Sequence, residues 1–250
     1  MENAGHILGS SSVYMHIGEG SHEHRLLFSG DIKYEKSWLF DAATVRFPKA
    51  DTLVIESTYG GPQDFQPNRV DATHEIQDLV KLAVSRSGKI FCPVFAVGRS
   101  QEVMLAIDQL FKSGDVTPIT VWLDGMISEA TAIHASHPDY LNRDLRKQVL
   151  RGGEENPFNS PWFKQVDSRE QRESILNDPS PCIVLATSGM MTGGPIMEYF
   201  KNWAPELNNT LCFVGYQASG TMGRRLQSGH PEVPMVCLLY TSPSPRDVRS

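Results

Sequence analysis

From residue 89 onward the chain repeats one unit, which consists of an apolar strand, a loop that contains glycine, and a helix. The expected strand and helix of each unit are 89–95 with 100–111, 119–123 with 128–136, 182–186 with 196–203, and 211–214 with 221–226. Strands that alternate with helices predict a mostly parallel sheet covered on both faces. Right-handed crossovers then place all four glycine loops at the carboxyl edge of that sheet.

These loops lie beside helix N-termini, where free backbone N–H groups and the positive helix end favour anions. Their glycines are Gly98, Gly125, Gly189, Gly193, Gly194, Gly215 and Gly220. Four such loops at one edge suit a polyanion better than a single nucleotide. For any one loop, ordinary turn chemistry is an equal explanation.

The first 60 residues are expected to be richer in strands. The pattern predicts a hairpin of Ser12–Ile17 with Arg25–Phe28, and a third strand, Thr52–Glu56, with a buried run at 53–55. A helix over 73–86 follows, with Ile76, Leu79, Val80 and Ala83 on one face, and further helices are expected at 142–150 and 168–176.

Three motifs in the first part place a metal-capable or proton-handling side chain beside glycine. They are AGHILGS at 4–10, FSGD at 28–31 and ESTYGG at 56–61. A His followed by an Asp at successive strand ends is what a two-metal hydrolase requires. Neutral imidazole suits zinc, and one carboxylate can bridge two ions whose shared water attacks a phosphorus atom.

Alternatives remain for the titratable residues. His6 could be a satisfied core histidine and Asp31 a turn-forming residue, whereas Glu56 ends a buried strand and therefore needs a partner. The His-x-His of residues 21–24 reads as a solvated turn. His74, His134, His137 and His230 are expected at the surface or at helix ends.

Composition limits the classes of function. The net charge of −6 means that nucleic-acid binding must come from local basic or backbone sites. The cysteines form no close pairs and are expected to be small buried residues of a cytoplasmic, reducing compartment; they are Cys92, Cys182, Cys212 and Cys237. No apolar run is long enough to cross a bilayer, so no membrane partner is expected.

Seven motifs in fixed order carry a resemblance to a known family. They are AGHILGS (4–10), SGD (29–31), ESTYG (56–60), PVFAVGRSQE (93–102), LDGM (123–126), ATSGMMTGGP (186–195) and GYQASGTMGR (215–224). The chain resembles the β-CASP branch of the metallo-β-lactamase fold, whose members cut nucleic acids. More narrowly, it is similar to archaeal-type relatives of the nuclease subunit of the cleavage and polyadenylation specificity factor.

The resemblance implies an α/β fold: a partial metallo-β-lactamase αββα sandwich with an inserted Rossmann-like β-CASP domain. The expected division is 1–60 for the partial metallo-β-lactamase domain, 61–229 for the β-CASP domain, and 230–236 for the return to the first domain. Residues 241–250 have no apolar periodicity, and the tail 237–250 is expected to be foreign. We therefore expect an interior fragment of a longer protein.

The resemblance also implies roles for individual residues. His6 would bind zinc, Asp31 would bridge two Zn²⁺ ions, and Glu56 would pair with a later His and help to protonate the leaving oxygen. The residues expected to contact RNA are Arg99, Ser100, Ser188, Gly189, Gly193, Gly194, Tyr216, Gly220, Thr221 and Arg224.

The sequence departs from the family pattern in one respect. The upstream His-x-His-x-Asp-His cluster and two later histidines are absent, which leaves about two of seven ligand positions. We therefore expect that the fragment alone neither holds both zinc ions tightly nor cleaves RNA.

The function implied for the parent protein is zinc-dependent hydrolysis of RNA phosphodiester bonds, by internal or 5′–3′ cleavage. Its setting would be mRNA 3′-end processing, transcription termination or RNA decay, with RNA as partner and a homodimer as an option. A non-catalytic RNA-binding or scaffold protein is the alternative. A nucleotide-binding α/β domain of unrelated function is a third reading, and it predicts no role for His6 or Asp31.

Overall fold

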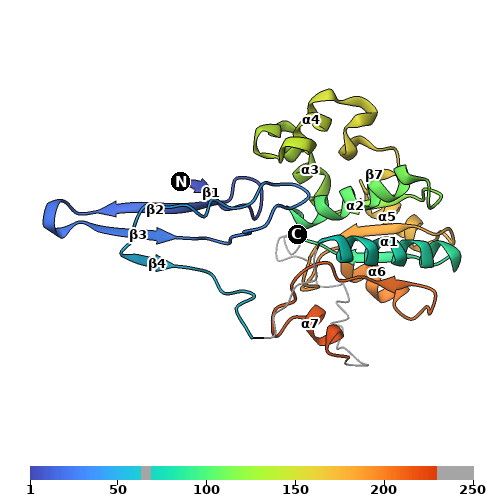
Figure 1. Ribbon diagram of the computed structural model, residues 1–250. Helices are drawn as coiled ribbons and strands as arrows, with labels where there is room; N and C mark the ends of the chain where they lie inside the picture. The colour runs from blue at the N-terminus through green and yellow to red at the C-terminus, as the bar shows by residue number, and fades with distance from the viewer. Residues whose placement is uncertain (63–68, 230–250) are drawn as a thin grey trace, which may run out of the picture.

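The computed structural model describes residues 1–62 and 69–229, and two β-sheets lie within this part of the chain. The first sheet has the strand order β1-β2-β3-β4, and the second has the order β7-β6-β8-β5-β9. In Figure 1 strands β2, β3 and β4 extend away from a body that contains the second sheet and the helices.

The first sheet is built from short strands, of which β3 and β4 are joined by the long segment 29–51. Its members are β1 (Glu2–Asn3), β2 (Ser11–Ile17), β3 (His24–Phe28) and β4 (Thr52–Val54). β2 and β3 are antiparallel, with Ile17 opposite His24, so the expected hairpin is confirmed. β3 and β4 are parallel, and Asp51 ties their starts together by accepting hydrogen bonds from the backbone and guanidinium of Arg25. These bonds lower the pKa of Asp51 to about 2.

The expected burial of residues 53–55 is wrong. Leu53, Val54 and Ile55 are 54%, 42% and 57% exposed. β4 is the edge strand of its sheet, and residues 1–62 contain no α-helix that could cover either face. An apolar run indicates a capacity for burial, but burial itself requires a second surface.

The second sheet is entirely parallel, which confirms the α/β fold class with an inserted parallel sheet. Its strands are β5 (Ile90–Pro93), β6 (Val121–Asp124), β7 (Phe163–Gln165), β8 (Ile183–Ala186) and β9 (Thr210–Leu211). The helices are α1 (Arg69–Ser85), α2 (Arg99–Ser113), α3 (Ile127–Ser136), α4 (Arg143–Arg151), α5 (Arg169–Asn177), α6 (Ile196–Trp203) and α7 (Met222–Gln227). The edge strand β7 was not expected, and β9 is shorter than expected.

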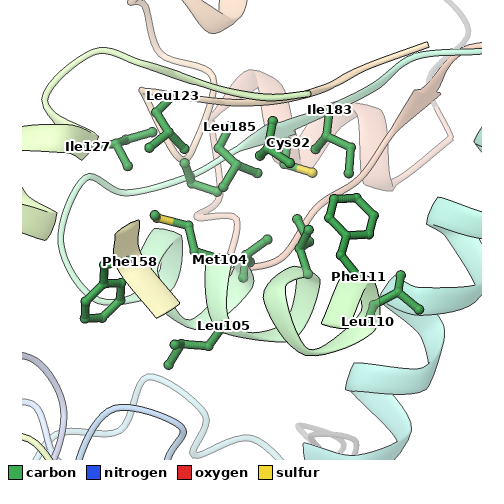
Figure 2. Packing of buried hydrophobic residues seen from close by; sticks show 14 of the residues in the cluster. Cys92, Met104, Leu105, Leu110, Phe111, Leu123, Ile127, Phe158, Ile183 and Leu185 are labelled. Atoms are coloured by element: carbon green, nitrogen blue, oxygen red, sulfur yellow. The ribbon is translucent and has the colours of Figure 1, made fainter. Parts of the chain in front are cut away.

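Alternate residues of the central strands pack into two separate cores, as a sheet buried on both faces requires. Cys92, Leu123 and Leu185 point into the larger core, where they meet Met104 and Phe111 of α2 (Figure 2). Helices α1, α3 and α4 also contribute to this core. The alternating strand residues, such as Phe91 and Val184, face a second core, where they meet Ile175 of α5 and Tyr199 of α6.

Asn142 joins the first 60 residues to the helical body. Its side-chain oxygen caps α4 by accepting from the backbone N–H groups of Asp144 and Leu145. Its amide donates to the carbonyl of Trp38 at 2.7 Å, and its backbone N–H donates to the carbonyl of Leu39 at 2.7 Å. Leu39 belongs to the larger core. A segment expected to belong to the first domain is therefore anchored in the second body.

His134 is a core residue, which corrects its expected place at the surface. Its ring is 1% exposed and lies 6.0 Å from the ring of Phe40. Nδ1 donates to the carbonyl of Ala130 at 2.7 Å, and Nε2 has no hydrogen-bond partner. The expectation failed because His134 shares one buried face of α3 with Ile127 and Ala130.

Burial lowers the pKa of His134, against a smaller opposing effect of its hydrogen bond to Ala130. Below about pH 6.5, the unfolded chain therefore binds a proton at His134 more readily than the folded chain does. We expect the free energy of unfolding to fall as the pH drops below this value, by at most about 1.4 kcal/mol per pH unit from this group.

Urea unfolding at pH 7 and pH 5.5 measures this effect. The variant His134→Gln should lose less stability between the two pH values than the wild type. His137→Gln, at the exposed end of the same helix, is the matched control and should behave as the wild type. An equal loss in all three proteins would contradict the assignment.

Candidate functional site

Three titratable side chains of the first part meet at one end of the first sheet. His6 lies in the loop between β1 and β2, Asp31 follows β3, and Glu56 follows β4. His6 Nε2 is 3.9 Å from Asp31 Oδ2, and their side chains are 45% and 71% exposed. His6 is therefore not a buried core histidine. We call His6, Asp31 and Glu56 the donor corner.

The partners of Glu56 include two backbone N–H groups and the side chain of Thr58. Its two carboxylate oxygens accept hydrogen bonds from the N–H groups of Thr58 at 2.8 Å and Ile32 at 3.3 Å. Burial raises the pKa of Glu56, but these hydrogen bonds and the nearby His6 outweigh it, so the net pKa is lowered. Glu56 is thus held as a carboxylate and is tied to the loop that carries Asp31.

Two glycines with positive φ shape the loops that carry His6 and Asp31. Gly5 has a φ of +68°, and a Cβ there would lie 2.7 Å from the carbonyl oxygen of Lys33. Gly30, with a φ of +58°, directly precedes Asp31. Ser10 Oγ accepts from the N–H groups of both His6 and Ile7, which fixes the loop between β1 and β2. Only glycine combines such φ values with such close approach.

The donor corner fits part of a zinc shell. Imidazole nitrogen and carboxylate oxygen are both zinc ligands, and bonds of about 2.0–2.2 Å to one ion would span their 3.9 Å separation. A zinc site needs four donors, however. Across residues 1–62 and 69–229, no group of three or more His, Cys, Asp or Glu side chains is arranged to hold a metal.

The carboxyl ends of β5, β6, β8 and β9 carry the glycine loops along one edge of the second sheet. We call these loops the loop edge; they are 94–98, 125–126, 187–195 and 212–221. Neighbouring loops support one another. Gln217 Nε2 donates to the carbonyl of Gly189 at 2.8 Å, and the Gly223 N–H donates to the carbonyl of Met190. The convergence expected from the sequence is therefore present.

Residues close to the donor corner in the sequence, Ile7 and Tyr59, contact the loop edge. A Cβ on Gly98 would lie 3.0 Å from Cγ2 of Ile7, the residue that follows His6. On the other side, the rings of Tyr59 and Tyr216 pack edge to face with centroids 5.6 Å apart. Residues far apart in the sequence thus bring metal donors and glycine loops to one place.

The two arginines expected to contact RNA differ in how freely they can do so. Arg99 pairs with Glu102 at 2.6 Å, and its side chain is 39% exposed. Arg224 lies exposed on α7, whose first turn is capped by Thr221. Gly220, with a φ of +85°, precedes that cap, and a Cβ added there would meet no atom within 4 Å.

The loop after β8 is folded on itself around Ser188. Its hydroxyl donates to the carbonyl of Gly193 at 3.0 Å and accepts from the N–H of Thr192 at 3.0 Å. Gly194 has a φ of +78°, and a Cβ there would lie 2.7 Å from the carbonyl oxygen of Thr187. The roles expected for Ser188, Gly193 and Gly194 stay predictions.

Two residues expected to contact RNA are buried. Ser100 is 0% exposed, and its hydroxyl donates to the carbonyl of Ala96 at 2.8 Å. Gly189 is also buried, and a Cβ there would lie 2.9 Å from the ring of Phe95. In this structure both residues shape their loops and offer no free surface to a ligand.

A buried ionic network below the loop edge was missed from the sequence. Asp124 at the end of β6 is 2% exposed and accepts from Arg172 at 2.6 and 2.8 Å and from the Tyr199 hydroxyl at 2.7 Å. The hydrogen bonds to Asp124 raise the pKa of Arg172, and burial raises that of Tyr199. The only available signal was an acidic residue at the end of an apolar strand.

Comparison with known proteins identifies the family. The model of the Beta-Casp domain matches residues 100–226, which is just over half of the chain. The chain belongs to the β-CASP family. The expected resemblance is thereby confirmed, and the matched β-CASP region contains three of the four strand ends that carry the loop edge.

Several similar curated proteins are described as transcription termination factor FttA. One from Methanosarcina mazei is 54% identical over 233 residues, which cover 93% of this chain and 36% of that protein. Those from Cenarchaeum symbiosum and Methanocaldococcus jannaschii are 48% and 47% identical over 94% of this chain. The chain thus spans 36–37% of the length of these three relatives.

The division at residues 60 and 61 stays a prediction, as do the expected site roles. The expected segments 230–236 and 237–250, and His230, lie outside the described residues. No helix within 1–62 and 69–229 is long and apolar enough to span a membrane.

Proposed function

We propose that this chain forms the RNA-binding and part of the metal-binding surface of a zinc-dependent ribonuclease that acts in transcription termination. The observation that carries the proposal is that residues beside the donor corner contact the loop edge, at Ile7 with Gly98 and at Tyr59 with Tyr216. The description of the relatives as transcription termination factors supports termination as the setting.

The residues present have separate tasks in this proposal. His6 and Asp31 would hold zinc, which would supply Lewis-acid chemistry by lowering the pKa of water and polarising phosphoryl oxygens. The loop edge holds the sugar-phosphate backbone through N–H groups and the exposed Arg224. Because hydrogen bonds lower the pKa of Glu56, this residue acts as a carboxylate that orients a protonated partner.

A non-catalytic RNA-binding protein is the second candidate. It is favoured because His6 and Asp31 are the two residues of the donor corner assigned to the metal. Within residues 1–62 and 69–229, no group of three or more His, Cys, Asp or Glu side chains is arranged to hold a metal ion. The enzyme is preferred because a merely RNA-binding surface has no use for a carboxylate and an imidazole placed together beside a phosphate path. Like charge there would weaken RNA binding.

Zinc content tests the incomplete shell. We expect the purified chain to retain clearly less than two equivalents of zinc after dialysis, because two donors do not close a tetrahedral site. Elemental analysis measures the ratio, and an RNA cleavage assay on the same sample should show no activity. Two retained equivalents together with cleavage would contradict this expectation.

RNA binding tests the loop edge. Arg224→Gln and Arg99→Gln should each weaken binding of single-stranded RNA by up to about 5-fold and reduce the salt slope by about 0.7. Arg224 should have the larger effect, because Arg99 is already paired with Glu102.

The matched control is Arg86→Gln, an exposed arginine between α1 and β5 at the opposite edge of the sheet. Filter binding over a salt series measures all four proteins. If Arg86→Gln lowers affinity as much as Arg224→Gln does, the loop edge is not the binding surface. A cytoplasmic location and a homodimer stay predictions.

A further inference from the structure

Two cysteine thiols meet between β5 and the edge strand β9. These strands are parallel, with Phe91 opposite Leu211, and the N–H of Cys212 donates to the carbonyl of Phe91 at 3.1 Å as part of the ladder. The next residues along the two strands, Cys92 and Cys212, therefore lie opposite each other. Cys92 points into the larger core, and Cys212 packs against the same core (Figure 2).

The place of the two thiols allows a bond between them. They line one small apolar cavity together with Leu79 and Val80 of α1. Opposite residues of neighbouring strands have Cα atoms about 5 Å apart, which lies within the range of about 4.4–6.8 Å that a disulfide requires. β9 (Thr210–Leu211) is short and lies at the end of its sheet beside β5, so a small shift of this strand can bring the sulfur atoms to bonding distance.

The two thiols differ in access and in acidity. Cys92 is 3% exposed, whereas Cys212 is partly exposed. The interaction with the Cys92 thiol lowers the pKa of Cys212, against smaller opposing effects of burial and of Glu75. The same interaction, together with burial, raises the pKa of Cys92. The thiolate, which is the form that reacts with oxidants, is therefore favoured at the thiol that solvent reaches.

We propose that Cys92 and Cys212 form a reversible disulfide site that is oxidised by hydroperoxides such as hydrogen peroxide. The Cys212 thiolate attacks one peroxide oxygen, the O–O bond breaks, and hydroxide leaves, which gives a sulfenic acid at Cys212. The sulfur of Cys92 then attacks the sulfur of Cys212, and the sulfenic oxygen leaves as water with the proton of Cys92. In sum, two thiols lose two electrons and two protons, and one peroxide becomes two waters.

The bridge acts on the start of one glycine loop. Cys212 opens the loop 212–221, and β5 leads directly into the loop 94–98. The bond fixes the edge strand to β5, and it also restricts the unfolded chain by closing a long loop between residues 92 and 212. We therefore expect slower amide exchange in 210–221 and a higher melting temperature. This inference goes beyond the proposed function and is independent of it, because neither RNA nor zinc takes part.

Peptide mapping tests the site on the intact 250-residue chain, treated with hydrogen peroxide in the folded state. Trypsin releases the peptides 90–99 and 202–224, and each contains one cysteine of the pair. In the wild type we expect these two peptides to be joined, and dithiothreitol should separate them. The bridged chain should melt about 5–15 °C above the reduced chain.

Single variants separate the two steps. In Cys92→Ala, Cys212 has no thiol to resolve it and should gain oxygen as a sulfenic or sulfinic acid. In Cys212→Ala, the buried Cys92 should stay reduced. Cys182→Ala is the matched control, because Cys182 is 5% exposed in the second core and burial raises its pKa to about 11. This control should form the bridge as the wild type does, and melting of each reduced variant verifies its fold.

Three results would overturn the site. One is a wild-type chain that keeps both thiols after peroxide treatment, and another is a bridge that forms only in urea. The third is a link from 202–224 to the peptide 226–246, which contains Cys237, in place of the link to 90–99. Each of these results leaves the proposed function standing, because that function does not require the bridge.

Discussion

Replacing Asp31 by asparagine is expected to lower RNA cleavage by at least about 1,000-fold, the largest effect in this account. The change keeps the shape of the side chain but removes the negative charge that faces His6 at 3.9 Å. A neutral amide is a much weaker zinc ligand than a carboxylate. Losing metal-based charge stabilisation raises the activation free energy by about 4 kcal/mol or more, which corresponds to this factor.

A chimera is the appropriate protein for this test. In it, this chain replaces the matching segment of the Methanosarcina mazei relative, of which it covers 36%. Single-turnover cleavage and RNA affinity are measured together. Affinity should be unchanged or slightly tighter, because the substitution removes a negative charge near phosphate.

Asp41→Asn is the control for this substitution, since it makes the same chemical change at another exposed position of the first 60 residues. It should leave both cleavage and affinity as in the unsubstituted chimera. Cleavage that survives Asp31→Asn at more than a tenth of its original rate would remove Asp31 from the metal site. A parallel loss in affinity would instead indicate a folding defect.

Asp124→Asn is expected to lower the free energy of unfolding by about 3–5 kcal/mol. Asp124 is buried and neutralises Arg172, whose side chain is 19% exposed, while it also accepts from the Tyr199 hydroxyl. Removing its charge leaves Arg172 with little access to water and only the longer, 3.5 Å pair with the half-exposed Glu198. The network joins β6 to α5 and α6, so its loss should also loosen the loop edge above it.

The control for this change is Glu173→Gln, which removes one carboxylate charge from an exposed pair with Arg169 on α5. Exposed pairs contribute about 0–1 kcal/mol, so this variant should remain close to the wild type. Urea unfolding at pH 7 compares the three proteins. Similar midpoints for Asp124→Asn and the wild type would show that the network adds little stability.

The parallel sheet could be predicted because its signal is local and repeated. Each unit contains an apolar strand, a glycine loop and a helix, and α6 has the bounds expected from its pattern, Ile196–Trp203. Helix caps were also local: Asn142 and Ser168 accept hydrogen bonds from the first turns of α4 and α5. Such features depend on a few neighbouring residues, so a single sequence contains them.

Burial was harder to predict because it depends on which surfaces meet. The apolar run at 53–55 lacks a covering layer among the described residues, and His134 is buried beneath Phe40 from a distant segment. Nothing near His134 in the sequence indicates that contact. The anchoring of Leu39 in the larger core is likewise a long-range event.

The candidate site was predicted in position but not in detail. Strand ends placed His6 and Asp31 together, as observed. The partners of Glu56 include backbone N–H groups, which carry no sequence signature. Ser100 and Gly189 match the family motif yet are buried, because a motif contains residues that build a loop as well as residues that contact a ligand.

Photocrosslinking tests the location of the RNA most directly. The 250-residue chain is irradiated with single-stranded RNA that contains 4-thiouridine, and crosslinked peptides are identified by mass spectrometry. The account predicts crosslinks within 94–99, 187–195 and 212–224, at the carboxyl edge of the second sheet. Crosslinks confined to the opposite edge, in the segments 86–89, 178–182 and 206–209, would contradict it.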